Sequence, residues 1–205
     1  MHRVTDILLA LALALSLPAW SAERAANTVR VAAGDATAAD ADEASRAYFT
    51  DLELVTQNGE DVRFFSDVLK DRIVLINFIF THCQDACPMM TQKLKSSRAL
   101  LDEQIRNRVH FISISIDPER DTPAAMKEFA SRYDLADDSN WVFLTGAPEN
   151  VNTIVKKLGQ YTSEVENHST LVLAGNVNDH YWMKIPPMDP PGIIAERLRL
   201  LAQGQ

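Results

Sequence analysis

The chain has 205 residues, of which 46% are hydrophobic, and its 28 acidic and 20 basic side chains give a formal net charge of −8. This length suits one domain plus a removable or disordered N-terminus. The acidic balance argues against nucleic acid and anionic membrane surfaces as partners, because both carry negative charge themselves.

The N-terminus predicts export from the cytoplasm. His2 and Arg3 precede an apolar run from Ile7 to Leu17, and Ala19 and Ser21 then form a small-x-small cleavage pattern. This order is typical of a secretory signal peptide. Because the apolar run is too short to span a bilayer comfortably, retention as an inner-membrane anchor is the weaker alternative.

Three segments follow from this assignment. We assign residues 1–21 to a signal peptide, 22–47 to a flexible alanine-rich arm without a core pattern, and 48–205 to the folded domain. Export places the only two cysteines, Cys83 and Cys87, in an oxidising compartment, where a thiol pair must be kept reduced or loaded with metal. We therefore expect the protein in the periplasm.

The folded domain begins with a predicted hairpin and a central strand. Leu52–Val55 and Val62–Phe65 read as strands on either side of the turn signal Asn58-Gly59. A helical turn at Ser66–Leu69 precedes Ile73–Phe80, an uninterrupted apolar run that is typical of a fully buried strand.

The central strand leads into the two cysteines. Cys83 lies in a short polar bend, and Cys87 stands directly before Pro88, a residue that favours the first turn of a helix. At this spacing the two sulfurs can share a metal ion or form a disulfide. A disulfide across so small a loop would stabilise the fold by only about 2 kcal/mol, so the pair is predicted to be chemical. Since a helix N-terminus favours a thiolate, we expect Cys87 to have the lower thiol pKa.

The rest of the chain alternates helices with strands. The expected elements are a helical stripe from Pro88 to about Arg106, a buried strand at Val109–Ile116, a helix from Pro123 to Tyr133 with Thr122 as its N-cap, a strand at Trp141–Leu144, a helix at Pro148–Leu158, a hairpin of Thr170–Ala174 and Tyr181–Ile185 with its turn at Gly175-Asn176, and a helix at Ile193–Ala202. This order predicts an α/β fold with a central mixed sheet flanked by helices and an added N-terminal hairpin.

His168 is the histidine best placed to join the cysteines. It precedes the strand at Thr170–Ala174, in a polar loop that can reach the end of the central strand. Taken alone, a loop histidine is more often a solvated surface group. His82 adjoins Cys83, but neighbouring side chains usually point apart, so it ranks lower. Two thiolates with one imidazole suit copper, whereas zinc would want a fourth ligand or a water.

Four segments of the chain resemble the Sco/SenC family of thioredoxin-fold copper proteins. They are the C-x-x-x-C-P loop with its preceding residues at Phe78–Pro88, the stretch S-I-D-P-E-R-D-T-P at Ser115–Pro123, the strand W-V-F-L-T-G at Trp141–Gly146, and the pair His168-Ser169. The resemblance covers roughly Leu52 to Ala202. It implies a thioredoxin-like fold, with Cys83, Cys87 and His168 as copper ligands. It also implies help in assembling the binuclear copper centre of cytochrome c oxidase, as copper donor, as thiol reductant, or both.

Three features depart from the family pattern. Asn167 stands where the family commonly has an aspartate before the histidine, a cleavable-looking signal stands in place of the usual membrane anchor, and the Pro186–Pro191 loop is unlike the usual C-terminus. These departures make copper binding a firmer expectation than the oxidase target.

Two functions of different classes compete. The first is an exported metallochaperone that delivers copper to, or prepares the thiols of, a target such as a cytochrome c oxidase subunit. The second is an enzyme, a thiol:disulfide oxidoreductase with Cys83 and Cys87 as its redox pair. The long C-x-x-x-C spacing, and His168-Ser169 where such oxidoreductases carry a proline, favour metal binding. A peroxidase is disfavoured, because Phe80 and Gln84 occupy the positions where its pattern requires a hydroxyl residue.

Overall fold

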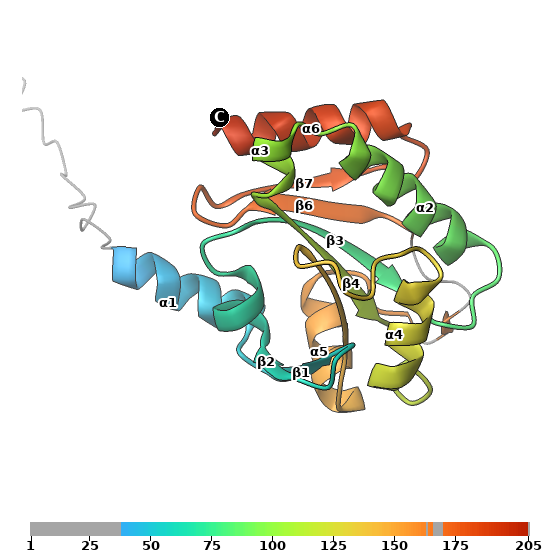
Figure 1. The fold of residues 1–205 in the computed structure, drawn as a ribbon. Coiled ribbons are helices and arrows are strands. Elements are labelled where there is room, and N and C mark those ends of the chain that lie inside the picture. The colour runs from blue at the N-terminus through green and yellow to red at the C-terminus, as the bar shows by residue number, and fades with distance from the viewer. Residues whose placement is uncertain (1–37, 163, 166–169, 205) are drawn as a thin grey trace, which may run out of the picture. The chain divides into compact units, whose positions relative to one another are not determined.

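The computed structural model describes residues 38–162, 164–165 and 170–204 (Figure 1). Within these ranges the core is a seven-stranded sheet of order β2-β1-β5-β4-β3-β6-β7. The strands are β1 (Glu53–Thr56), β2 (Asp61–Arg63), β3 (Ile73–Ile79), β4 (Val109–Ser115), β5 (Trp141–Thr145), β6 (Val172–Asn176) and β7 (Tyr181–Ile185). Strands β3, β4 and β5 run parallel, and the pairs on either side are antiparallel. The predicted mixed sheet is confirmed.

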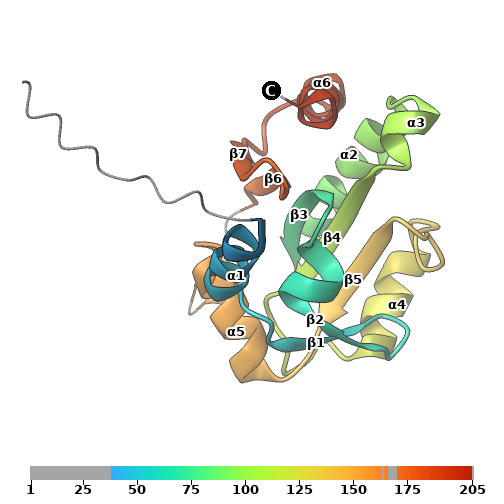
Figure 2. The same ribbon diagram turned by 90° about the vertical axis from the view of Figure 1, so that its left-hand side faces the viewer.

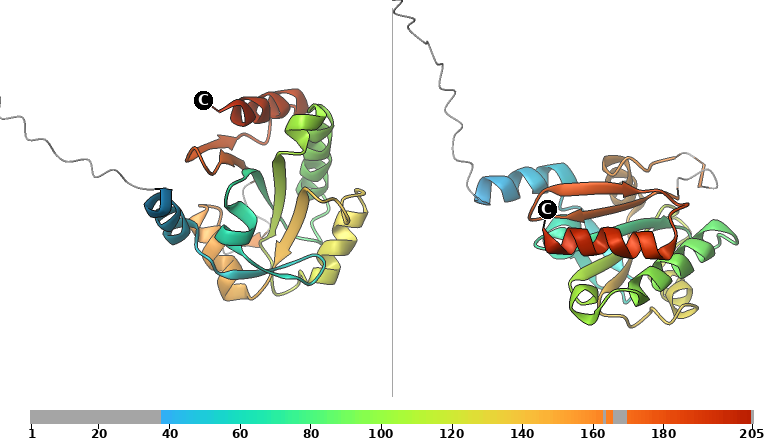
Figure 3. Two further views of the ribbon diagram at one scale, coloured as in Figure 1. Left: turned by 60° about the vertical axis from the view of Figure 1, so that its left-hand side comes forward. Right: turned by 90° about the horizontal axis from the view of Figure 1, so that it is seen from above.

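Helices cover both faces of the sheet. They are α1 (Ala38–Phe49), the π-helical turn η1 (Phe64–Leu69), α2 (Ala86–Ala99), α3 (Glu103–Arg106), α4 (Pro123–Ser131), α5 (Pro148–Lys157) and α6 (Pro191–Gln203). One buried apolar cluster joins the sheet to α2, α4 and α6, and a second joins its other face to η1, α5 and the end of α1. Figure 2 shows this division, and Figure 3 shows α2 and α6 side by side. No helix in the described part of the chain is long and apolar enough to cross a bilayer.

The central strand β3 positions the cysteine loop. All seven of its residues are buried, which explains why this segment lacks the polar alternation of a surface strand. It pairs in parallel with β4 from Ile73 opposite Val109 to Ile79 opposite Ser115. The carboxyl ends of the two strands therefore lie together, and the loops that follow them are neighbours.

Helix α1 differs from the sequence expectation of an arm over residues 22–47, because residues 38–47 are helical. Alanine has the highest helix propensity, and tertiary contacts hold the helix in place. The buried Phe49 ring lies 5.0 Å from the Trp182 ring. Lys157 Nζ donates to Ala47 O at 3.2 Å, and Lys70 forms an ion pair with Asp42. Residues 1–37 lie outside the described part of the chain.

Two local predictions were wrong. The helical stripe after Pro88 is divided into α2 and α3, because the Asp102 carboxylate accepts from Ile105 N at 2.9 Å and starts a new helix. Gly175 and Asn176 belong to β6 rather than to a turn, and the hairpin reverses over residues 177–180.

The packing of Trp182 explains why position 175 is a glycine. It pairs across the strands with Trp182, and a Cβ added to it would lie 2.5 Å from Trp182 Cδ2. We expect Gly175→Ala to lower the free energy of unfolding by about 1–3 kcal/mol, because the indole must move to admit the methyl group. Urea denaturation measures this. The matched control is Gly192→Ala in α6, where a Cβ meets nothing within 4 Å and stability should stay equal or rise. Equal behaviour of the two variants would contradict the packing argument.

Candidate metal centre

The two cysteines lie in and after the loop that joins β3 to α2. Cys83 is half-buried, Cys87 is only 2% exposed, and both are free thiols. Carboxyl ends of parallel strands are where open α/β sheets usually bind ligands. The loop therefore combines a favourable place in the fold with the only two thiols of the chain.

A direct contact joins the two residues. The backbone N–H of Cys87 donates to Cys83 Sγ at 3.3 Å. Helix α2 begins at Ala86, so this N–H belongs to the first turn and has no acceptor within the helix. The free donor of the helix N-terminus is thus used by the sulfur of Cys83. The predicted proximity of the pair is confirmed, and helix α2 causes it.

The low thiol pKa expected for Cys87 was wrong. Burial raises the pKa of the Cys87 thiol above its usual range, and the hydrogen bond with Cys83 adds to this shift. The Cys87 side chain packs into the apolar cluster with Phe80 and Met90, where a charged thiolate would lose its hydration. The sequence argument assigned the helix dipole and the free N–H donors of the helix N-terminus to the Cys87 sulfur, whereas the Cys87 N–H contacts the sulfur of Cys83.

This difference predicts ordered alkylation of the reduced, metal-free protein. Iodoacetamide should label Cys83 first, and Cys87 should react only as the pH rises above the ordinary thiol range of about 8.5, because its raised pKa keeps it protonated below that. Mass spectrometry of the singly alkylated protein at pH 7 and pH 9 measures the order. In urea, where neither thiol is buried, the two rates should become similar. Earlier labelling of Cys87 at pH 7 would contradict the prediction.

The fully buried Asp121 carboxylate holds the residues that precede the cysteines. It accepts hydrogen bonds from Thr81 N at 3.0 Å, from Thr81 Oγ1 at 2.6 Å and from Ser115 Oγ at 2.6 Å. Thr145 Oγ1 also donates to the Asp121 carbonyl at 2.6 Å. One residue therefore ties the ends of β3, β4 and β5 together and fixes the backbone two positions before Cys83.

His82 faces the same turn. Its Nε2 lies 3.2 Å from Asp117 Oδ2, and its Nδ1 lies 3.3 Å from Thr81 Oγ1. Arg120 Nε donates to the same Asp117 oxygen at 2.6 Å. The His82 ring therefore contacts Asp117, in the turn that follows β4.

The reasoning from single residues missed this polar network. It recognised only Thr122 as a helix cap, and Ala125 N does donate to Thr122 Oγ1 at 3.2 Å. The available signal was the pair of aspartates, Asp117 and Asp121, directly after a buried strand parallel to the one that carries the cysteines.

His168, the third expected ligand, lies outside the described residues. Strand β6 follows it in the chain and pairs antiparallel with β3, with Leu173 opposite Ile76. The start of β6 is therefore at the same edge of the sheet as the end of β3. Within the ranges that the structure describes, no cluster of three or more His, Cys, Asp or Glu side chains could hold a metal ion.

Comparison with known proteins identifies the family. The family model described as SCO1/SenC matches residues 40–203. The SCO1 protein homolog of Bacillus subtilis is 38% identical over 129 residues, which cover 58% of this chain and 64% of that protein. The chain thus spans slightly less than two thirds of the length of this relative.

Solved structures agree with this assignment. ScoI of Bradyrhizobium japonicum, described with copper bound, is 28% identical with a TM-score of 0.58, over 72% of this chain and 94% of that one. BsSco, described as having a disulfide switch and as a member of the Sco family of cytochrome c oxidase assembly proteins, is 26% identical with a TM-score of 0.61, over 77% and 94%. The mixed sheet of the present chain, flanked by helices, is therefore a thioredoxin-like fold, and the chain belongs to the SCO1/SenC family.

Proposed function

We propose that this protein is an exported metallochaperone that binds one copper ion through Cys83, Cys87 and His168. The observation that carries the proposal is the pair of free thiols at the carboxyl end of β3, joined by the Cys87 N–H contact to Cys83 Sγ at 3.3 Å. Copper is the cargo. The target is a copper-site protein such as a cytochrome c oxidase subunit, which receives the metal or has its thiols prepared by this protein.

The chemistry of the donor set fits copper. Thiolates are soft ligands that select Cu(I), and imidazole suits both oxidation states of copper. Loading must displace the thiol protons, and the raised pKa of Cys87 makes that proton harder to remove. Affinity is therefore expected to increase with pH through and above neutrality. The network around Asp121 supports the site by holding Thr81, two residues before Cys83.

The relatives support the cargo and the class of target. ScoI of Bradyrhizobium japonicum is described with copper bound, and BsSco is described as belonging to a family of cytochrome c oxidase assembly proteins. For localisation, the support is the signal pattern of residues 1–21, from which we propose a periplasmic protein, with an inner-membrane anchor if the segment is retained.

A thiol:disulfide oxidoreductase is the second candidate. The half-buried Cys83 beside the buried Cys87 matches an attacking thiol with a resolving partner. A disulfide between them leaves no thiolate for Cu(I), so oxidation and copper loading compete for the same two sulfurs.

Copper stoichiometry and thiol titre, measured on protein purified from the periplasm and reduced, test the proposal. We expect one copper per chain, two titratable thiols without metal, and no copper binding by the disulfide form. The deciding comparison sets copper transfer to a dithiolate acceptor against insulin reduction by the metal-free dithiol. Rapid insulin reduction without copper transfer would overturn the metallochaperone and favour the oxidoreductase.

A further inference from the structure

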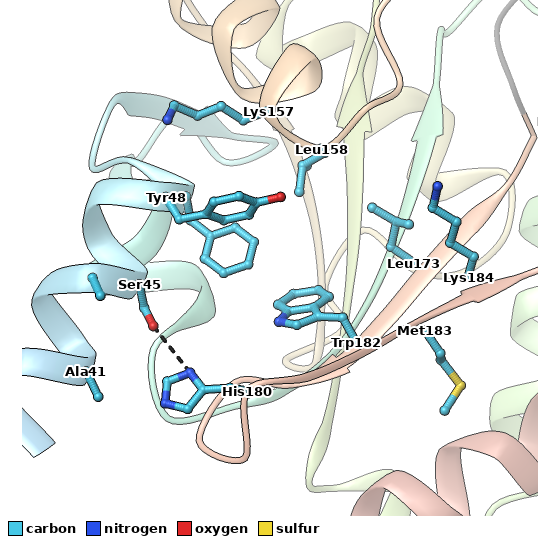
Figure 4. A pocket seen from close by; sticks show the side chains of 12 residues that line it. Ala41, Ser45, Tyr48, Lys157, Leu158, Leu173, His180, Trp182, Met183 and Lys184 are labelled. Carbon is cyan, nitrogen blue, oxygen red and sulfur yellow. Dashed lines mark hydrogen bonds between the residues drawn. The ribbon is translucent and has the colours of Figure 1, made fainter. Parts of the chain in front are cut away.

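A cavity of about 590 Å³ lies on the face of the β6–β7 hairpin opposite to α6, between α1 and α5 (Figure 4). It is lined by Ala41, Ala44, Ser45, Tyr48, Phe49, Lys157, Leu158, Leu173, His180, Trp182, Met183 and Lys184. Neither cysteine lines it. Its size falls in the range that binds drug-sized molecules, and most of its lining is apolar.

Aromatic rings form the apolar part of this cavity. The Trp182 indole rests on Gly175, which no larger residue could replace without displacing the ring. Phe49 lies 5.0 Å from Trp182, and Tyr48 meets Phe49 edge to face at 4.8 Å. Tyr48 is 61% exposed, so much of this residue beside the cavity is open to solvent. The hairpin face is thus apolar and only partly covered.

The wall contributed by α1 keeps the cavity open. Ala41, Ala44 and Ser45 present small side chains where larger ones would fill the space. The helix is anchored within this wall by the 3.5 Å contact between Ser45 Oγ and His180 Nδ1 that Figure 4 shows, and one turn further along by the buried Phe49. The open volume therefore follows from residue size at a docked helix.

The charged lining side chains share one sign. Lys157 and Lys184 line the cavity, and no aspartate or glutamate does, although the chain has 28 acidic and 20 basic residues. Lys157 already donates to Ala47 O at 3.2 Å. The Lys184 ammonium group has no hydrogen-bond or ion-pair partner among the described residues, and in Figure 4 it lies near Leu173 at the edge of the cavity. The complementary ligand is apolar with an anionic end.

We propose that this cavity binds a free medium-chain fatty acid. The acyl chain lies against Trp182, Tyr48 and Leu173, and the carboxylate lies at Lys184. Apolar burial supplies most of the affinity, and the ammonium group orients the chain. The site is separate from the cysteine pair, so its occupancy requires no copper.

Calorimetric titration of the metal-free full chain with dodecanoate tests this proposal. We expect one binding site. Lys184→Glu should weaken binding by about five- to tenfold, because it replaces an attraction with a repulsion at an exposed position. Ala44→Trp should abolish binding by filling the cavity. The matched control is Lys127→Glu, the same charge change on α4, where the ammonium group contacts Asn58 outside the cavity. It should bind dodecanoate like the unchanged protein.

Each other outcome overturns the proposal. Absence of saturable binding removes the site, and unchanged affinity in Ala44→Trp means that dodecanoate binds elsewhere. Unchanged affinity in Lys184→Glu, with loss in Ala44→Trp, leaves an apolar cavity that does not recognise a carboxylate. Sedimentation with phosphatidylglycerol vesicles without dodecanoate binding would make the face a membrane contact. Circular dichroism of each variant confirms folding, and copper loading of the same samples tests the separate metal proposal.

Discussion

We expect Cys83→Ala or Cys87→Ala to abolish tight copper binding, and His168→Ala to weaken it while leaving the fold intact. The cysteines supply both thiolates of the proposed site, and Cu(I) depends on soft sulfur ligands more than on imidazole. Loss of a group that only orients a metal ligand costs about 10- to 100-fold in affinity, so loss of a thiolate should cost more. Competition with a Cu(I) chelator measures the change.

The control for this series is His180, another histidine of the same protein that lies outside the proposed copper site. His180 has a positive φ of 51°, which asparagine tolerates, and it lines the cavity beside α1. His180→Asn should therefore keep full copper affinity. Stoichiometric copper in the double cysteine variant after dialysis against a chelator would show that the assigned ligands are wrong.

Copper should also stabilise the native protein, by about 4 kcal/mol at a thousandfold excess over the dissociation constant.

We expect Asp121→Asn to lower the free energy of unfolding by about 3 kcal/mol. The carboxylate is fully buried and accepts from Thr81 N, Thr81 Oγ1 and Ser115 Oγ, and hydrogen bonds to a charged group contribute about 1.5–3 kcal/mol each. An amide of the same shape turns one acceptor into a donor, which leaves a buried polar group without its partner. Urea denaturation measures the loss. Since Thr81 precedes the cysteine loop, copper affinity should fall as well.

The matched control is Asp134→Asn. Asp134 forms an ion pair with Lys95 at 3.1 Å, but its side chain is 90% exposed, so the change should cost less than about 1 kcal/mol. The same chemical substitution is thus compared in a buried and an exposed setting. Equal effects on unfolding would show that the buried hydrogen bonds contribute nothing particular to stability.

Local pattern in the sequence predicted most of the sheet. Ile73–Phe80 and Val109–Ile116 are continuous apolar runs, and they form the buried parallel strands β3 and β4 within one residue of the expected ends. The cap at Thr122 was predicted because its hydroxyl acts on a residue three positions away. Features of this kind depend on neighbours in the chain and on alternation between polar and apolar residues. Both can be recognised in the sequence before the fold is known.

The candidate site was predicted in part. Four-residue spacing at a helix start was enough to expect Cys83 and Cys87 together, and the N–H of Cys87 in the first turn of α2 contacts Cys83 Sγ in the preceding loop. The raised pKa of the Cys87 thiol was not predictable in the same way. It depends on how deeply Cys87 is buried and on which sulfur receives the helix N–H, and distant residues of the core determine both.

Only the tertiary structure showed the Asp121 network and the cavity beside α1. Asp121 contacts Thr81 from 40 positions away, and the cavity joins α1 to strand β7 across more than a hundred residues. Such contacts form when strands and helices pack, and no local sequence pattern predicts which distant residues will come into contact. The sequence by itself therefore determined the strands and the thiol pair, since these follow from local hydrophobicity and spacing. Packing decided the acidity of Cys87, the support of its loop and the open face of β7, because burial is a property of the whole folded chain.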